Sequence, residues 1–216
     1  REFDAFLLVV DGVPWGGAFN PALATLDFSD VERIEVLRGS APVMYGATSF
    51  VGVIQVVRQA PGTKGGRLIG SAGSYGSGSI TARSALPELG SLRSSLSANV
   101  DREGFKDDRT QFERGHVLWR GGIAAGGGNV RLDLDGTWLR QDPGSPTPRE
   151  GTELSPAVPL DANNNPEGAH INERRLYFAG GYDHPAFGTA DWSTTATVTK
   201  SHQGILRGFL TDLSGA

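Results

Sequence analysis

The sequence contains no cysteine, which excludes disulfide bonds, thiolate metal sites and cysteine nucleophiles. It also lacks a long hydrophobic run. A transmembrane helix needs about 20 consecutive apolar residues, and no stretch of these 216 residues approaches that length. The sequence therefore excludes a helical membrane protein. It does not exclude a membrane β-barrel, because half of each barrel strand faces a polar interior and lowers the average hydropathy.

Basic residues are not in excess, since 20 Lys and Arg stand against 24 Asp and Glu and the formal net charge is -4. Nucleic-acid binding depends on clustered Lys and Arg that neutralise phosphates, and no such cluster stands out. We therefore expect no nucleic-acid partner. The chain begins with Arg rather than Met, shows no signal segment and stops at Ala216, so we expect a fragment of a longer protein.

Residues 1–61 contain short, dense apolar runs that predict strands covered by protein on both faces. Ser29 and Glu32 have the spacing of a capping box, which predicts a short helical turn there. Pro61 and Gly62 mark the end of this unit. The pattern predicts a small mixed α/β domain over residues 1–61, with strands in three segments: Phe6 to Val10, Ile34 to Leu37, and Val51 to Val57.

From residue 66 onward, apolar and polar residues alternate with period two. The alternation is clear in three segments and weaker in four others, and these predict about seven strands of the length found in membrane barrels. The second predicted domain therefore covers residues 62–216. The clear segments are 92–101, 130–138 and 190–198, and the weaker ones lie near 67–75, 79–86, 112–124 and 174–182.

The connections between these segments also differ in length. The connections are short after the second, fourth and sixth strands and longer after the third and fifth. The connection after the fifth strand spans about residues 141–171. Short turns on one side and long loops on the other are typical of outer-membrane barrels. The segment 141–171 is therefore predicted to be a long extracellular loop.

Two interpretations fit the alternation. The apolar face either packs against a soluble core or meets lipid while the polar face lines a wet lumen. The aromatic residues favour lipid, because Trp138 lies beside the long loop while Tyr182 and Trp192 flank a short turn, as interfacial aromatic residues do. Leu118 on the polar face and Glu113 on the apolar face depart from the pattern.

Three motifs in the first third resemble a known family. They are "VDGVP" at residues 10–14, "DVERIEVLRGSAPVMYG" at 30–46 and "GVIQVVRQAP" at 52–61. In this order they resemble the C-terminal half of the plug domain of TonB-dependent outer-membrane receptors. Val51 and Gly52 stand where that family commonly has two glycines, which is a mild departure.

The resemblance implies a membrane all-β fold. An antiparallel transmembrane β-barrel, incomplete at about 7 of roughly 22 strands, would follow part of a small α/β plug domain. The implied function is a receptor and transporter of the bacterial outer membrane, in contact with lipid. It would take up a scarce ligand, with a ferric siderophore first and haem, cobalamin or a glycan as other candidates. The inner-membrane TonB complex would supply energy through a missing N-terminal segment, and no cofactor is implied.

The resemblance also suggests functional residues. Arg38 matches a plug arginine that pairs with glutamates on the barrel wall, and Glu35 belongs to the same run, so these two are candidates for a plug–barrel lock; an ordinary solvated pair is the alternative. Trp15, Phe19 and Asn20 match the plug apex that faces the external cavity, where they could contact a ligand. Simple packing against the barrel wall is the alternative for these three.

No catalytic or metal site is predicted. Asp161, Asn163 and Asn165 have the first spacings of a calcium loop, but Pro166 replaces the required glycine, so a polar external loop is the preferred interpretation. No carboxylate pair or nucleophile arrangement suits catalysis, and we expect no enzyme. The alternative to a transporter is a soluble or surface-attached β-rich binding or adhesin module, which would explain the alternation but not the motifs of the first third.

Overall fold

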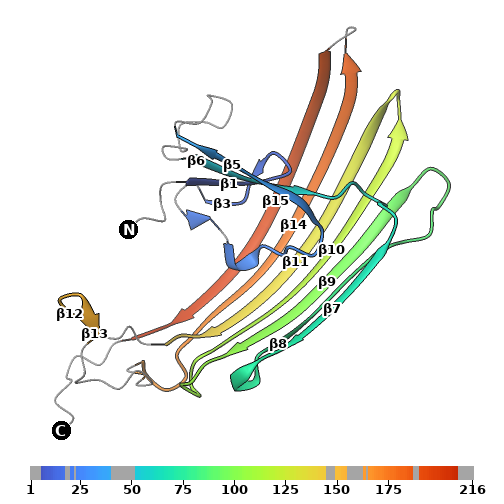
Figure 1. Cartoon of the computed structure of the whole chain (residues 1–216). Coiled ribbons are helices and arrows are strands. Elements are labelled where there is room, and N and C mark those ends of the chain that lie inside the picture. Colours follow the sequence, from blue (N-terminus) through green and yellow to red (C-terminus); the bar gives the residue numbers. More distant parts are fainter. Residues whose placement is uncertain are drawn as a thin grey trace.

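The computed structural model describes residues 6–17, 20–21, 23–39, 52–144, 149–154, 163, 165–186 and 190–208. These residues form two main sheets, a four-stranded small sheet and a seven-stranded long sheet (Figure 1). Among the described residues, no helix has the length and apolar character needed to cross a membrane.

The small sheet has the order β2-β1-β6-β5, with strands β1 (Phe6–Val10), β2 (Val13–Pro14), β5 (Val31–Arg38) and β6 (Gly52–Arg58). β1 and β6 are parallel, and β5 is antiparallel to β6. Asp11 and Gly12 connect β1 to β2 and both have positive φ angles, of 47° and 84°, which is the backbone of a tight hairpin turn. The three predicted strands of the first third are therefore confirmed.

Burial differs among these strands. Leu8, Val9 and Val10 of β1 are each exposed by 2% or less, as expected for a strand covered on both faces. β5 lies at the edge of the sheet, and its Ile34 and Val36 are exposed by 49% and 60%. The expectation that all three apolar runs are covered on both faces is therefore wrong for β5.

The predicted helical turn at Ser29 and Glu32 is also wrong. Residues 29 and 30 form a turn, and β5 begins at Val31. The Ser29 hydroxyl donates to the carboxylate of Asp27 instead of capping a helix. Helical geometry in the described part of this unit is limited to the 3-10 turn η2 (Leu23–Thr25), and a short strand pair, β3 (Gly16–Gly17) with β4 (Asn20–Pro21), precedes it.

The long sheet is antiparallel throughout, in the order β15-β14-β11-β10-β9-β8-β7. This confirms the prediction of about seven barrel strands. A 3-10 turn, η4 (Ser74–Gly76), joins the first two strands, and a separate hairpin, β12 (Arg149–Glu150) with β13 (Glu153–Leu154), lies between β11 and β14. The seven strands are β7 (Gly66–Ala72), β8 (Gly78–Ala85), β9 (Arg93–Gly104), β10 (Gln111–Ala125), β11 (Gly128–Asp142), β14 (His170–Ala186) and β15 (Ala190–Leu206).

Because neighbouring strands are antiparallel, alternate connections lie at opposite ends of the long sheet. Residues 105–110 and 143–169 connect strands at one end, which we call the long-loop end. Residues 86–92, 126–127 and 187–189 connect strands at the other, short-turn end. The predicted boundary between residues 61 and 62 falls between β6 and β7, and the domain limits stay a prediction.

The long sheet is curved, and the small sheet lies on its concave side (Figure 1). Its concave face carries polar residues such as Ser95, Ser97 and Asn99, each exposed by 5% or less. Its convex face exposes apolar side chains, and the parity is the one predicted from the sequence. Leu118 lies on the concave face and is 1% exposed, as its departure from the pattern indicated. The exposed convex residues include Leu132, Leu134, Leu176, Phe178 and Val198.

Candidate functional site: the buried polar interface between the sheets

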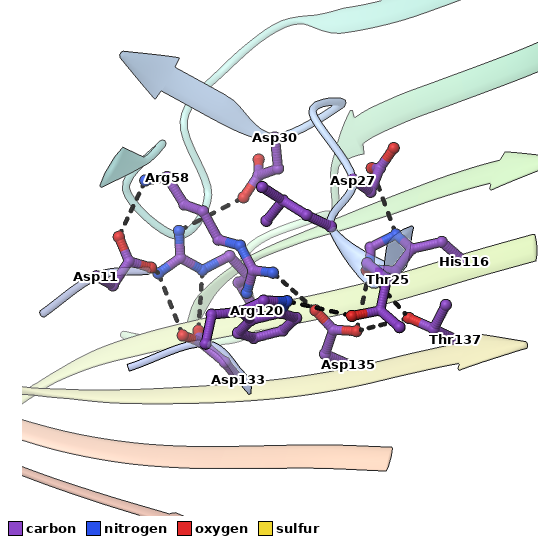
Figure 2. A network of polar contacts seen from close by, with 12 residues as sticks. Asp11, Thr25, Asp27, Asp30, Arg58, His116, Arg120, Asp133, Asp135 and Thr137 are labelled. Carbon is purple, nitrogen blue, oxygen red and sulfur yellow. Dashed lines mark hydrogen bonds and ion pairs between the residues drawn. The ribbon is translucent and has the colours of Figure 1, made fainter. Parts of the chain in front are cut away.

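Charged side chains of both sheets meet in a buried layer, which we call the interface network (Figure 2). Loops and strand ends of the small sheet supply one side, and the concave faces of β10 and β11 supply the other. Period-two alternation directs these β10 and β11 residues toward the small sheet. The members are Asp11, Asp27, Asp30 and Arg58 from the N-terminal unit, and His116, Arg120, Asp133 and Asp135 from the long sheet.

Arg120 is the central residue of the interface network and is 2% exposed. Its Nε donates to Asp133 Oδ1 of the neighbouring strand at 2.9 Å. Its Nη2 donates across the interface to Asp11 Oδ2 at 2.8 Å, and its Nη1 donates to the carbonyl oxygen of Gln59 at 2.7 Å. Asp30 Oδ2 lies 3.5 Å from Nη1. The planar, five-donor guanidinium thus connects the two units, as a lysine could not.

A second ion pair has its cation on the N-terminal unit and its anion on the long sheet. Arg58, the last residue of β6, donates from Nη2 to Asp135 Oδ2 at 2.7 Å, and the two side chains are exposed by only 1% and 2%. The backbone N–H of Arg58 donates to Asp11 Oδ1 at 2.9 Å. Asp11 therefore holds the end of β6 and Arg120 at the same time, so the small-sheet turn and the long sheet are fixed relative to each other.

His116 lies between two carboxylates from different units. Its Nε2 is 3.0 Å from Asp135 Oδ1 and its Nδ1 is 3.3 Å from Asp27 Oδ2. Burial alone would raise the pKa of Asp27, but the hydrogen bonds from His116 and Ser29 outweigh it and lower the pKa to about 2. Asp27 is therefore an anion at neutral pH and a charged partner for the long sheet.

Two further arginines connect the units at the margin of the interface network. Arg83 of β8 donates to Asp30 Oδ1 at 2.6 Å. Arg114 of β10 donates to the carbonyl oxygen of Leu26 at 2.8 Å while its Nη2 lies 2.8 Å from Asp101 Oδ1. The contacts between the two units therefore extend over β8, β10 and β11.

The energetics of such an interface favour specificity. Desolvation makes buried ion pairs weak sources of net stability, but removal of one partner leaves an uncompensated buried charge and costs about 3–5 kcal/mol. The interface network therefore fixes one relative position of the two units. Because it contains no covalent bond, it can also be separated and re-formed.

Trp15 lies in this interface and is 1% exposed. Its ring centroid is 4.9 Å from that of Tyr177 on β14, and its Nε1 donates to Thr25 Oγ1 at 3.2 Å. The guanidinium carbons of Arg58 and Arg175 lie 5.2 and 4.3 Å from the ring centroid. Trp15 thus packs against the wall of the long sheet, and its contact with a ligand stays a prediction. Phe19 and the side chain of Asn20, the other apex candidates, lie outside the described residues.

The two predicted lock residues lie on β5, away from this layer. Glu35 accepts a hydrogen bond from Arg33 Nε of the same strand at 2.7 Å, in an exposed pair. Arg38 is exposed at the end of β5. Their role as a plug–barrel lock stays a prediction.

Sequence reasoning missed the residues of the interface network, although one signal was present. Asp133 and Asp135 crowd the polar face of β11, while Asp11 and Arg58 directly follow dense apolar runs of the first unit. Charges at such positions indicate an interface between two units only when the strand pairing is known.

The predicted interfacial aromatic residues lie toward opposite ends of the long sheet. Trp138 is near the long-loop end and is 48% exposed. Tyr182 and Trp192 are near the short-turn end, with ring centroids 6.1 Å apart, and the Tyr182 hydroxyl donates to the carbonyl oxygen of Gly126 at 3.1 Å. This placement suits two membrane interfaces, and that role stays a prediction.

The segment with Asn163 and Asn165 contacts residues 107–109 through a side-chain amide and a guanidinium. Asn163 Nδ2 donates to Asp107 Oδ2 at 2.8 Å, and Arg109 Nη2 donates to the carbonyl oxygen of Asn165 at 2.7 Å. Asp161 lies outside the described residues. Within the part of the chain that the structure describes, no group of three or more His, Asp or Glu side chains could hold a metal ion.

Comparison with known proteins agrees with this geometry. Residues 1–53 match the family model of the TonB-dependent receptor plug domain. Residues 1–53 are therefore similar to the plug of a TonB-dependent receptor. By this similarity the small sheet corresponds to the plug and the long sheet to the barrel wall of these receptors. The protein is localised to the bacterial outer membrane. No curated protein sequence matches the chain.

Solved structures of such receptors share the fold. The pyoverdine outer-membrane receptor FpvA from Pseudomonas aeruginosa is 16% identical, covers 98% of the chain and has a TM-score of 0.80. The siderophore receptor PiuA from Acinetobacter baumannii is 17% identical over 91% of the chain, with a TM-score of 0.75. The ferric citrate transporter FecA is 15% identical over 94%, with a TM-score of 0.72. The chain spans 32%, 29% and 32% of the lengths of these three structures.

Proposed function

We propose that this protein takes up an iron complex across the outer membrane, with a ferric siderophore as the first candidate ligand. The similar structures are receptors for siderophores and a transporter for ferric citrate, which supports iron complexes over haem, cobalamin or a glycan. Energy would come from the inner-membrane TonB complex through a segment N-terminal to the described plug residues.

The observation that carries this proposal is the interface network. A receptor of this kind needs a plug that closes the lumen at rest and yet moves when force is applied. Buried, charge-matched and non-covalent contacts, such as those of Arg120 with Asp11 and Asp133, meet both needs. These contacts strongly disfavour a shifted position of the plug, but they can form again without any covalent change.

The convex face argues against a surface module without transport. Leu134, Leu176 and Val198 are exposed by 51%, 66% and 68% on the same face of the long sheet. A soluble protein rarely exposes a contiguous apolar face of this kind, whereas lipid would cover it in a membrane barrel.

Uptake of radiolabelled iron tests the proposal. The whole receptor is expressed in a bacterium that lacks its own siderophore receptors, and cells are supplied with ferric hydroxamate, catecholate, citrate and pyoverdine complexes. We expect accumulation of at least one complex, abolished in a matched strain without TonB. Uptake that is independent of TonB would contradict the energy source, and binding of none of these complexes would contradict the ligand class.

A further inference from the structure

His116 of β10 is buried between two carboxylates that belong to different units (Figure 2). The residue is 1% exposed. Its Nε2 lies 3.0 Å from Asp135 Oδ1 of the barrel wall, and its Nδ1 lies 3.3 Å from Asp27 Oδ2 of the plug. Both ring nitrogens therefore face a carboxylate oxygen.

The protonation state of the ring follows from this geometry. A neutral imidazole has one N–H donor and one lone pair, whereas an imidazolium has two N–H donors. A neutral ring would therefore turn its lone pair toward one of the two carboxylates, and a buried carboxylate that loses a donor is costly. Only the imidazolium suits Asp27 and Asp135 at the same time.

Asp27 depends on this proton more than Asp135 does. Arg58 donates to Asp135 Oδ2 at 2.7 Å, so Asp135 has a second cationic partner. Asp27 is 6% exposed, and it also accepts hydrogen bonds from the hydroxyl and the backbone N–H of Ser29. Within the described part of the chain, His116 is the only ion-pair partner of Asp27. Without the ring proton, the plug would hold a buried anion that no cation compensates.

Other cations nearby do not replace this proton, because they have other acceptors. Arg114, on the same face of β10, donates to Asp101 Oδ1 at 2.9 Å and to the carbonyl oxygen of Leu26 at 2.8 Å. Arg175 donates to Thr25 Oγ1 at 3.2 Å. The charged groups around the ring are Asp27 from the plug, Asp135 from β11, Arg58 from β6, Arg114 from β10, Arg175 from β14 and Asp101 from β9.

We propose that the docked plug holds one proton on His116 and that loss of this proton loosens the plug. Displacement of the plug separates Asp27 from the ring and exposes the ring to water, so the docked state binds the proton more tightly than the displaced state. By linkage, docking is strongest at neutral pH and below, and it weakens as the pH rises and the proton passes to solvent. The low pKa of Asp27, about 2, keeps its carboxylate charged over this range.

Protease digestion of the plug in the whole purified receptor tests this inference. The digestion rate is measured from neutral to alkaline pH for wild type, His116→Gln and Asp27→Asn. Loss of a charged hydrogen bond shifts an equilibrium by about ten- to hundred-fold, so digestion of the wild-type plug should accelerate by that factor. Both variants should lose this pH dependence, because one lacks the ring and the other lacks the anion. His202→Gln, a change at an exposed histidine of β15, is the control and should keep it.

Nitrogen NMR of the His116 ring is a second test that needs no substitution, because it distinguishes an imidazolium from a neutral imidazole. Two protonated ring nitrogens are expected at neutral pH. A neutral ring would overturn the inference even where a variant fails to fold, and so would an unchanged pH dependence in His116→Gln or Asp27→Asn. Neither measurement involves an iron complex, so such a failure would leave the proposed function standing.

Discussion

Arg120 shows how much of the plug position depends on single side chains. Its guanidinium donates to a barrel carboxylate, a plug carboxylate and a plug carbonyl group, so Asp133, Asp11 and Gln59 are all fixed by one residue. Arg102 of β9 offers a contrast, since its ion pair with Glu113 is at 3.7 Å and both side chains are about half exposed. Arginine–carboxylate pairs therefore differ in their effect on stability at these two positions, because the pairs of Arg120 are buried and the Arg102–Glu113 pair is solvated.

The first prediction compares these two arginines in the whole receptor. Arg120→Ala removes the cation that lies between Asp11 and Asp133, leaves Asp133 only the longer 3.6 Å contact with Arg131, and should destabilise plug docking by about 3–5 kcal/mol. Arg102→Ala, the control, should cost less than about 1 kcal/mol because its pair is solvated. Protease digestion of the plug over a urea series measures both. Equal protease resistance of the two variants would show that the interface network does not hold the plug.

At the scale of elements, the sequence predicts strands well and their contacts poorly. Alternation in 130–138 predicts β11 and its two faces because the side-chain period of a strand is local information. Pairing across the interface is not local. Arg120 and Asp11 are 109 residues apart, and Arg58 and Asp135 are 77 apart, so the interface network depends on the register of the sheet and on plug placement. The predicted helical turn at Ser29 does not form, because the Ser29 hydroxyl group donates to the carboxylate of Asp27, two residues earlier.

The second prediction concerns the pairing of β5 and β6. A Cβ atom at Gly52 would lie 2.3 Å from the backbone oxygen of Leu37, so the strands could not pair as they do. Gly52→Ala should destabilise the plug by about 1–3 kcal/mol. Gly70→Ala is the control, because a Cβ there meets nothing within 4 Å. The free energy of unfolding of the whole receptor in detergent measures both, and equal values for the two variants would contradict the close approach of β5.

At the scale of the whole molecule, the long sheet separates two environments. The plug covers its concave face over β8, β10, β11 and β14, where charges are buried, while its convex face exposes apolar side chains. Charged side chains of the plug therefore pair with charged side chains of the barrel wall. The apolar convex face suits contact with the hydrocarbon of lipid. This division was predictable from the sequence, because parity alone assigns each residue to a face.

The third prediction tests the contact with lipid. Leu134, near the middle of β11, pairs with Phe178, which pairs with Val198. Leu134→Arg should destabilise the receptor in a bilayer by about 2–4 kcal/mol because it places a cation at the membrane midplane. Thr197→Arg, at the same depth but on the concave face, should have little effect. Folding into vesicles, followed by heat-dependent gel mobility, compares the two. Tolerance of Leu134→Arg would contradict a lipid-facing convex side.

The distribution of charge in the interface network has a consequence for repeated transport. Each partner carries both signs: Asp11 and Arg58 on the plug, Arg120 and Asp135 on the wall. A plug that returned out of register would bring acid toward acid and base toward base, and such like-charge juxtaposition costs several kcal/mol. The distribution of charge therefore favours the one register of the plug that the structure shows. If the proposed uptake displaces the plug, this arrangement of charges favours its return to the same position.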